Sequence, residues 1–115
     1  MNVNQAADLL SQAIQESPEY IEYKTRKEVI DADAPIKALV DEYKRLQTLV
    51  QMRMLAGQGM QQDEDSQRFQ QLSALLFADQ RTSTYLLAEI RLQQMMAQVF
   101  ETVTRAADMN IPLPQ

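Results

Sequence analysis

Two short acidic groups, Asp31-Ala32-Asp33 and Asp63-Glu64-Asp65, are the residues best suited to binding chemistry. Carboxylates close together are the ligands that Ca²⁺ and Mg²⁺ prefer in proteins. Neither group supplies the spaced oxygens and the terminal glutamate of an EF-hand loop. Both groups stand where a helix is expected to begin, and aspartate is a good residue for capping the first amides of a helix. We therefore interpret both groups as helix caps and solvated charge, and we expect no bound metal or other cofactor.

The sequence contains no cysteine and no histidine, which limits the catalytic and metal-binding groups that the chain can supply. Their absence excludes thiolate nucleophiles, cysteine-ligated zinc, iron–sulfur clusters and every catalytic arrangement built on an imidazole. The two glycines, Gly57 and Gly59, are too few for a phosphate-binding loop. These absences predict a protein that is not an enzyme.

The charge balance also limits the partners, because 11 basic residues face 16 acidic ones and the formal net charge is −5. An acidic chain has no general attraction to nucleic acid or to anionic lipid. No apolar run approaches the length of about 18 residues that a membrane span needs. We expect a cytoplasmic protein that binds neither nucleic acid nor membranes directly.

The polar residues include 16 glutamines, as many as Asp and Glu together. Glutamine is a good helix former, and an uncharged polar face costs less to bury than a charged one. The glutamines therefore indicate either a surface that binds a partner protein or an ordinary solvated helix face.

The four tyrosines lie among aliphatic residues: Tyr20, Tyr23, Tyr43 and Tyr85. We expect them in a core or an interface rather than in a surface that stacks on nucleic-acid bases.

Apolar spacings of three and four residues predict helices along the whole chain. We expect helices at about 3–16 and 18–31, a third between the Asp33-Ala34-Pro35 start signal and Gly57, a fourth at 64–77 and a fifth at 80–107. Asp79 is the expected cap between the last two, although no glycine or proline stands there, and one continuous helix is the alternative. Pro112 and Pro114 predict an extended tail over 108–115. The expected fold is an all-α bundle of about five helices in one domain, 1–115, with a long C-terminal helix.

The fifth helix carries more apolar surface than one neighbouring helix could cover. One stripe has the alternating spacing of a coiled-coil seam: Tyr85, Ala88, Leu92, Met95 and Val99. A second stripe runs beside it: Leu86, Ile90, Met96, Phe100, Val103 and Ala107. We expect the seam to contact a partner and the second stripe to face the interior of the bundle. A monomer would leave the seam in water, so we predict a homodimer.

Four motifs together resemble the YlbF/YmcA family of small bacterial helical proteins: Ser17-Pro18-Glu19-Tyr20, Asp33-Ala34-Pro35, Ala56-Gly57-x-Gly59 and the run from Tyr85 to Leu92. The resemblance covers roughly residues 4–107. It implies an all-α fold with a long last helix that associates with copies of itself or with relatives. It also implies a regulatory role without known catalysis. Some members form a complex that acts on mRNA processing by an endoribonuclease and thereby affects competence, biofilm formation and sporulation.

The chain departs from this family pattern in one respect. The members of that complex carry cysteines linked to iron–sulfur clusters, and this chain has none. Our leading hypothesis is a helical adaptor that acts by protein–protein contact, with itself, a related helical protein or an RNA-processing complex as partner. The two alternatives are a Mg²⁺-dependent hydrolase that uses carboxylates and a subunit that binds RNA.

Overall fold

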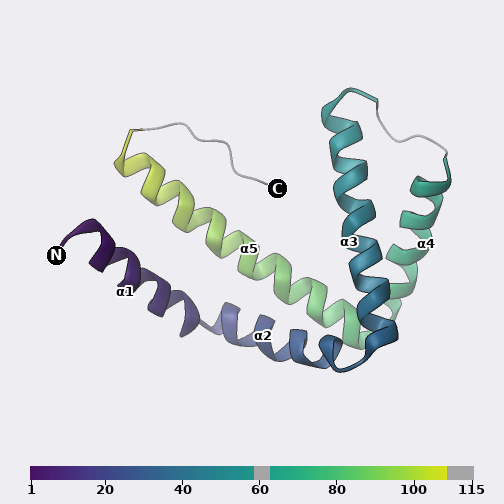
Figure 1. Ribbon diagram of the computed structural model, residues 1–115, viewed down its shortest axis with the longest axis horizontal. Coiled ribbons are helices and arrows are strands. Elements are labelled where there is room, and N and C mark those ends of the chain that lie inside the picture. The colour runs from purple at the N-terminus through teal and green to yellow at the C-terminus, as the bar shows by residue number, and fades with distance from the viewer. Residues whose placement is uncertain (59–62, 109–115) are drawn as a thin grey trace. The chain divides into compact units, whose positions relative to one another are not determined.

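The computed structural model describes residues 1–58 and 63–108, and within these ranges the chain forms five helices and no strand (Figure 1). The all-α class, the five helices and the long last helix are confirmed. The bounds are α1 Val3–Gln15, α2 Pro18–Asp31, α3 Ala34–Leu55, α4 Glu64–Ala78 and α5 Gln80–Ala106. Of the tail predicted over 108–115, all but the first residue lies outside the described residues.

Local caps explain where the first three helices begin. The Asn2 side chain accepts the amide of Gln5 at 2.8 Å, and the Gln5 side chain accepts the amide of Asn2 at 3.0 Å, which is a capping box. The Ser17 hydroxyl accepts the Tyr20 amide at 3.2 Å, and the Asp33 carboxylate accepts the Ile36 amide at 3.2 Å. Each of these bonds satisfies a donor that the first turn of a helix leaves unpaired. The two start signals read from the sequence are thus confirmed.

The end of α3 depends on the one glycine of the described chain that has a positive φ, Gly57 at +78°. The amide of Gly57 donates to the Met54 carbonyl at 3.1 Å, and the amide of Gln58 donates to the Arg53 carbonyl at 2.9 Å. This pair of bonds is a Schellman motif, which needs a left-handed residue at the Gly57 position. The predicted end of the third helix is therefore correct.

The boundary between α4 and α5 is real, although no glycine or proline marks it. Asp79 has extended backbone angles, φ −91° and ψ 126°, and its carboxylate accepts the Arg81 amide at 2.8 Å. The Thr82 hydroxyl donates to the Leu76 carbonyl and lies 3.2 Å from the Asp79 carbonyl. These bonds satisfy carbonyls at the end of α4 that have no partner further along the helix. The alternative of one continuous helix is wrong.

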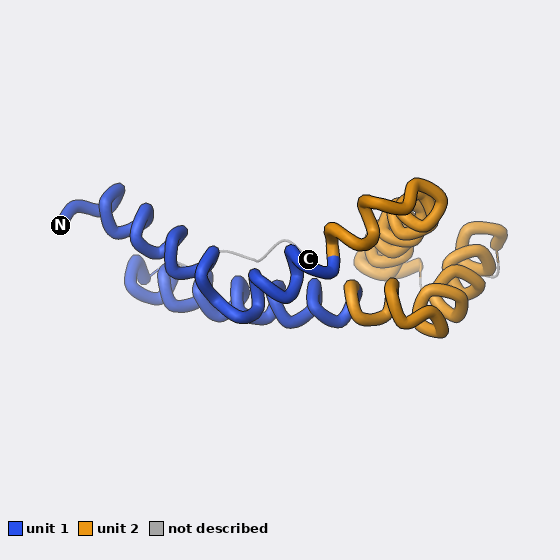
Figure 2. Tube along the Cα trace, turned by 90° about the horizontal axis from the view of Figure 1, so that it is seen from below, with its two compact units in different colours: residues 1–26, 86–115 blue, residues 27–85 orange. Residues whose placement is uncertain are grey.

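The chain divides into two compact units (Figure 2). The described part of unit 1 comprises residues 1–26 and 86–108, and unit 2 comprises Lys27–Tyr85. Helices α2 and α5 contribute residues to both units. The prediction that the chain is a single domain is not tested by this division and stays a prediction.

Unit 2 has a well-packed core in which α3 lies against α4. The buried apolar side chains of these two helices are Val40, Tyr43, Leu46, Val50, Leu72 and Leu76. The Tyr43 ring stacks on Phe69, with centroids 5.3 Å apart and planes 9° apart. It also meets Phe77 edge-on at 6.4 Å. Aromatic contacts of both kinds stabilise a core beyond the area that they bury.

Candidate interaction surface

The acidic group at 63–65 serves the fold of unit 2. Asp63 caps α4 by accepting the Ser66 amide at 2.9 Å. Its second oxygen lies 2.6 Å from the Arg53 guanidinium, which also reaches Asp65 at 3.3 Å. The group therefore starts one helix and ties it to the end of another, as the cap interpretation predicted.

The acidic group at 31–33 is used in the same way. Asp33 caps α3 and lies 3.2 Å from the Arg81 guanidinium, while Asp31 pairs with Lys27 at 2.9 Å. Across the part of the chain that the structure describes, no three or more carboxylates gather as a metal site would need.

The ion pairs of unit 2 hold carboxylates in their charged form. The hydrogen bond from Arg68, whose guanidinium reaches both oxygens of Glu42 at 2.8 and 3.1 Å, lowers the pKa of Glu42 below 4.5. The Ser66 amide lowers the pKa of Asp63 below 3.8, and the hydrogen bond from Arg81 lowers the pKa of Asp79 below the same value. These pairs link α3 to α4 and fix the starts of α4 and α5.

We expect unit 2 to lose stability in acid. A carboxyl whose pKa is lower in the folded chain stabilises the fold above its unfolded pKa, and this contribution disappears as the pH falls through the folded value. The melting temperature should therefore fall between about pH 5 and about pH 2. Circular dichroism melts at a series of pH values measure this fall. The double variant E42Q/D63N keeps an N-cap because asparagine also caps helices. It should show a smaller fall, and a wild-type melting temperature that is constant over this range would contradict the prediction.

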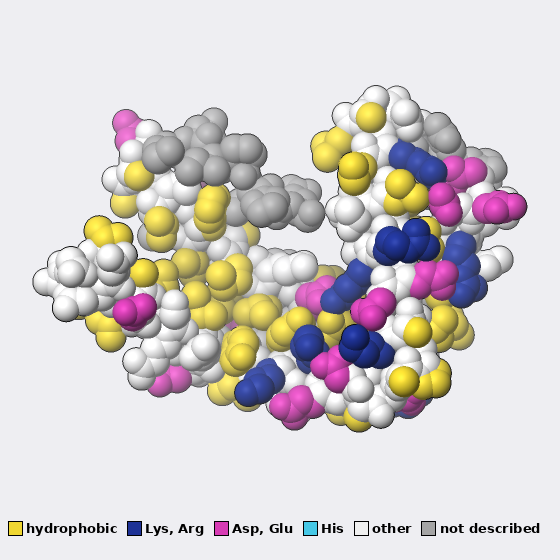
Figure 3. Space-filling view, in the orientation of Figure 1, with side chains coloured by type: hydrophobic (Ala, Val, Ile, Leu, Met, Phe, Trp, Pro, Cys, Tyr) yellow, Lys and Arg dark blue, Asp and Glu magenta, His cyan; other side chains and the backbone are white. Residues whose placement is uncertain are grey.

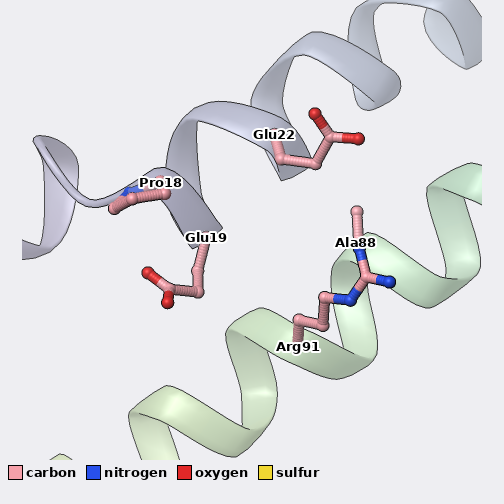
Figure 4. A pocket seen from close by; sticks show the side chains of 5 residues that line it. All are labelled: Pro18, Glu19, Glu22, Ala88 and Arg91. Carbon is pink, nitrogen blue, oxygen red and sulfur yellow. The ribbon is translucent and has the colours of Figure 1, made fainter.

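A shallow pocket of about 300 Å³ lies between α2 and α5 within unit 1. Its lining residues are Pro18, Glu19, Glu22, Ala88 and Arg91 (Figure 4). Glu22 is engaged by Arg26 at 2.9 Å on its own helix. The pocket offers carboxylates and one guanidinium but no nucleophile with a neighbouring base, which an acyl- or phosphoryl-transfer site would need.

The five residues predicted to contact a partner differ in exposure. Tyr85 is 3% exposed and belongs to unit 2, where the Lys44 ammonium donates to its hydroxyl at 2.5 Å and lies 4.8 Å from its ring centroid. Ala88 is 1% exposed in unit 1. These two side chains offer almost no surface to a partner. Leu92, Met95 and Val99 are half-buried, and their contact with a partner stays a prediction.

The second stripe of α5 is mostly turned toward water. Leu86 is buried and Phe100 is half-buried, but Ile90, Met96 and Val103 are exposed by 43%, 41% and 54%. The expectation that this stripe faces the interior of the bundle is therefore wrong for these three residues. Helical periodicity shows that a face is apolar, but it does not show which neighbour covers it.

Helix α1 has no buried residue at all. Hydrophobic side chains gather over α1 and the C-terminal half of α5 (Figure 3). We define the apolar surface of unit 1 as the exposed large hydrophobic residues of α1 and of the C-terminal half of α5: Val3, Leu9, Leu10, Met96 and Val103. Large exposed apolar patches mark sites of contact with proteins, membranes or ligands.

Fold and surface together define a small all-helical protein with exposed apolar residues on α1 and α5. The chain belongs to the family described as "Control of competence regulator ComK, YlbF/YmcA", whose model matches residues 3–107. This match confirms the resemblance seen in the sequence. No helix within the described ranges is both long and apolar enough to cross a bilayer.

Similar proteins occur in several bacteria. A UPF0342 protein of Caldicellulosiruptor saccharolyticus is 29% identical over 109 residues, which cover 95% of this chain and 90% of that protein. A UPF0342 protein of Symbiobacterium thermophilum is 26% identical over 92% of this chain and 94% of its own length. One of Bacillus cereus is 28% identical over 90% of this chain and 87% of its own length. No solved structure matches the chain.

Proposed function

We propose that this protein is a non-catalytic regulatory adaptor that acts in the cytoplasm by protein–protein contact. The observation that carries the proposal is the apolar surface of unit 1, since a protein that acted alone would leave this surface in water. The family description names control of a competence regulator, which supports a regulatory role rather than catalysis. The acidic net charge of −5 supports a protein partner over RNA.

The contact would be made mainly by apolar side chains of α1 and α5, with glutamines at its edge. Interface cores are depleted of charge, and uncharged amides can form hydrogen bonds at the rim at little desolvation cost. Gln93 and Gln94 lie on α5 beside the apolar residues and are exposed. This arrangement supports the interpretation of the glutamine-rich faces as partner-binding rather than only solvated.

The test is recovery of the tagged protein from the organism that encodes it, followed by mass spectrometry. We expect a stable protein partner with the wild-type chain and its loss with the double variant M96E/V103E. Q98E is the control, because it adds one negative charge at an exposed position of the same helix outside the apolar surface and should retain the partner. The adaptor role would be refuted by small-molecule turnover without any stable protein partner.

A further inference from the structure

The last turn of α3 carries three large hydrophobic side chains in water. Met52, Met54 and Leu55 are exposed by 62%, 56% and 89%. They come directly before the Schellman motif that ends the helix at Gly57. We call these three residues the apolar tip of unit 2, and hydrophobic side chains gather over this end of α3 (Figure 3). The tip belongs to a different compact unit from the apolar surface of unit 1.

The apolar tip is fixed to the core of unit 2. Val50, one turn before Met54, is 7% exposed and belongs to that core. The Arg53 guanidinium lies 2.6 Å from Asp63 and 3.3 Å from Asp65, which ties the end of α3 to the start of α4. The fold therefore presents the three side chains of the tip on a rigid helix end but buries little of them. Side chains held in this way are suited to contact with another molecule.

The charges beside the tip are mostly negative. The stretch 46–67 contains one basic residue, Arg53, and three acidic ones at 63–65, which leaves two surplus negative charges. Because Asp63 and Asp65 both contact Arg53, these charges lie next to the last turn of α3. An apolar patch with an acidic edge is the result.

This acidic edge indicates which molecule fits the tip. Surplus negative charge disfavours an anionic membrane and nucleic acid. A second copy is also disfavoured, because in a two-fold contact the same patch meets itself and the two acidic groups would face each other. A helix with apolar anchors and with lysine or arginine beside them complements both parts of the surface. Methionine side chains are flexible and adapt to the shape of such a helix.

We propose that the apolar tip of unit 2 is a docking site for a basic amphipathic helix of a partner protein. The apolar side chains of that helix pack on Met52 and Leu55, and its basic side chains pair with the carboxylates at 63–65. This site goes beyond the proposed function, whose contact lies on unit 1. The two surfaces recognise partners of different chemistry.

The experiment measures binding of a labelled synthetic peptide to the full chain by fluorescence anisotropy. The probe has leucines at helical spacing and lysines at its other positions, and the reference peptide has glutamate in place of each lysine. At about 0.15 M salt we expect the lysine peptide to bind and the glutamate peptide not to bind. The affinity for the lysine peptide should fall as salt is added, because salt screens the charge pairs. Absence of binding by the lysine peptide would overturn the proposal.

Variants of the chain locate the site. M52S/L55S removes two apolar anchors without changing the charge, and it should raise the dissociation constant at least about tenfold. Its helicity should match that of the wild type, since both side chains are exposed. E64Q removes one acidic charge and should raise the dissociation constant about two- to fivefold, the effect of one exposed ion pair.

The matched control for the anchors is L75S, which makes the same kind of change at a residue that is 54% exposed near the opposite end of α4. L75S should bind the lysine peptide like the wild type. If M52S/L55S also bound like the wild type, the net charge of −5 alone would explain the attraction, and the proposal would be overturned.

A further variant separates this site from the contact assigned to unit 1. M96S/V103S removes two side chains from the apolar surface of unit 1 and should bind the lysine peptide normally. Loss of peptide binding in this variant, with normal binding by M52S/L55S, would place the peptide on unit 1 and overturn the proposal. Binding that depends on Met52 and Leu55 supports the docking site even if no partner is recovered through unit 1. Failure of one proposal is therefore distinguishable from failure of the other.

Discussion

The variant L46A is expected to lose about 2–5 kcal/mol of the free energy of unfolding, which is the range for removing a buried leucine side chain. Leu46 is 1% exposed and lies on α3, the helix that packs against α4 to form the core of unit 2. The change leaves a cavity that the surrounding side chains fill only in part. A loss of this size is a large fraction of the total stability of a small domain.

The matched control is L75A on α4, because the same chemical change is made at a side chain that is largely in water. It should cost less than about 1 kcal/mol. Urea unfolding followed by circular dichroism measures both free energies. Equal losses for L46A and L75A would mean that the core of unit 2 is not where the structure places it.

The variant T82V is expected to cost about 1–3 kcal/mol, which is the penalty for leaving buried hydrogen-bonding groups without a partner. Valine has nearly the shape of threonine but cannot donate to the Leu76 carbonyl at the end of α4. Thr82 has no exposed surface, so water cannot replace the missing hydroxyl. The turn between α4 and α5 should be the first part of unit 2 to weaken, with lower protection of its amides against hydrogen exchange.

Thr48 supplies the control for this experiment. It lies exposed on α3, and its hydroxyl donates to the Lys44 carbonyl of its own helix at 3.1 Å. T48V should therefore change stability by less than about 0.5 kcal/mol. T82S keeps the hydroxyl and should retain normal amide protection at the turn. A T82V variant as stable as the wild type would show that the hydroxyl does not hold this turn.

The helices and their boundaries were predictable because capping is local. Ser17, Asp33 and Gly57 act through bonds to residues at most five positions away, so residue type and spacing are sufficient to find them. The boundary between α4 and α5 was harder to predict, since the residue that stabilises it most is a buried threonine, Thr82. Threonine is common inside helices as well, and only its burial beside the Leu76 carbonyl shows what it does.

Which apolar face of α5 packs against the rest of the chain was not predictable in the same way. The sequence shows two apolar stripes, but which one packs inside depends on neighbours that are far away along the chain. Tyr85 was expected at a partner contact, which stays a prediction; its side chain is buried, and its hydroxyl accepts a hydrogen bond from Lys44, 41 positions earlier. Ile90, Met96 and Val103 were expected inside and are exposed. The partner-binding surface therefore has to be sought from exposure and charge rather than from periodicity alone.

The division into two units also sets an order of events during synthesis. The core of unit 2 is made by α3 and α4, which are neighbours in sequence, and contacts between neighbouring segments form quickly. The described part of unit 1 joins residues 1–26 to residues that follow position 85, so its first helices wait while the whole intervening stretch is translated. We therefore expect unit 2 to form before residues 1–26 find their final contacts in unit 1.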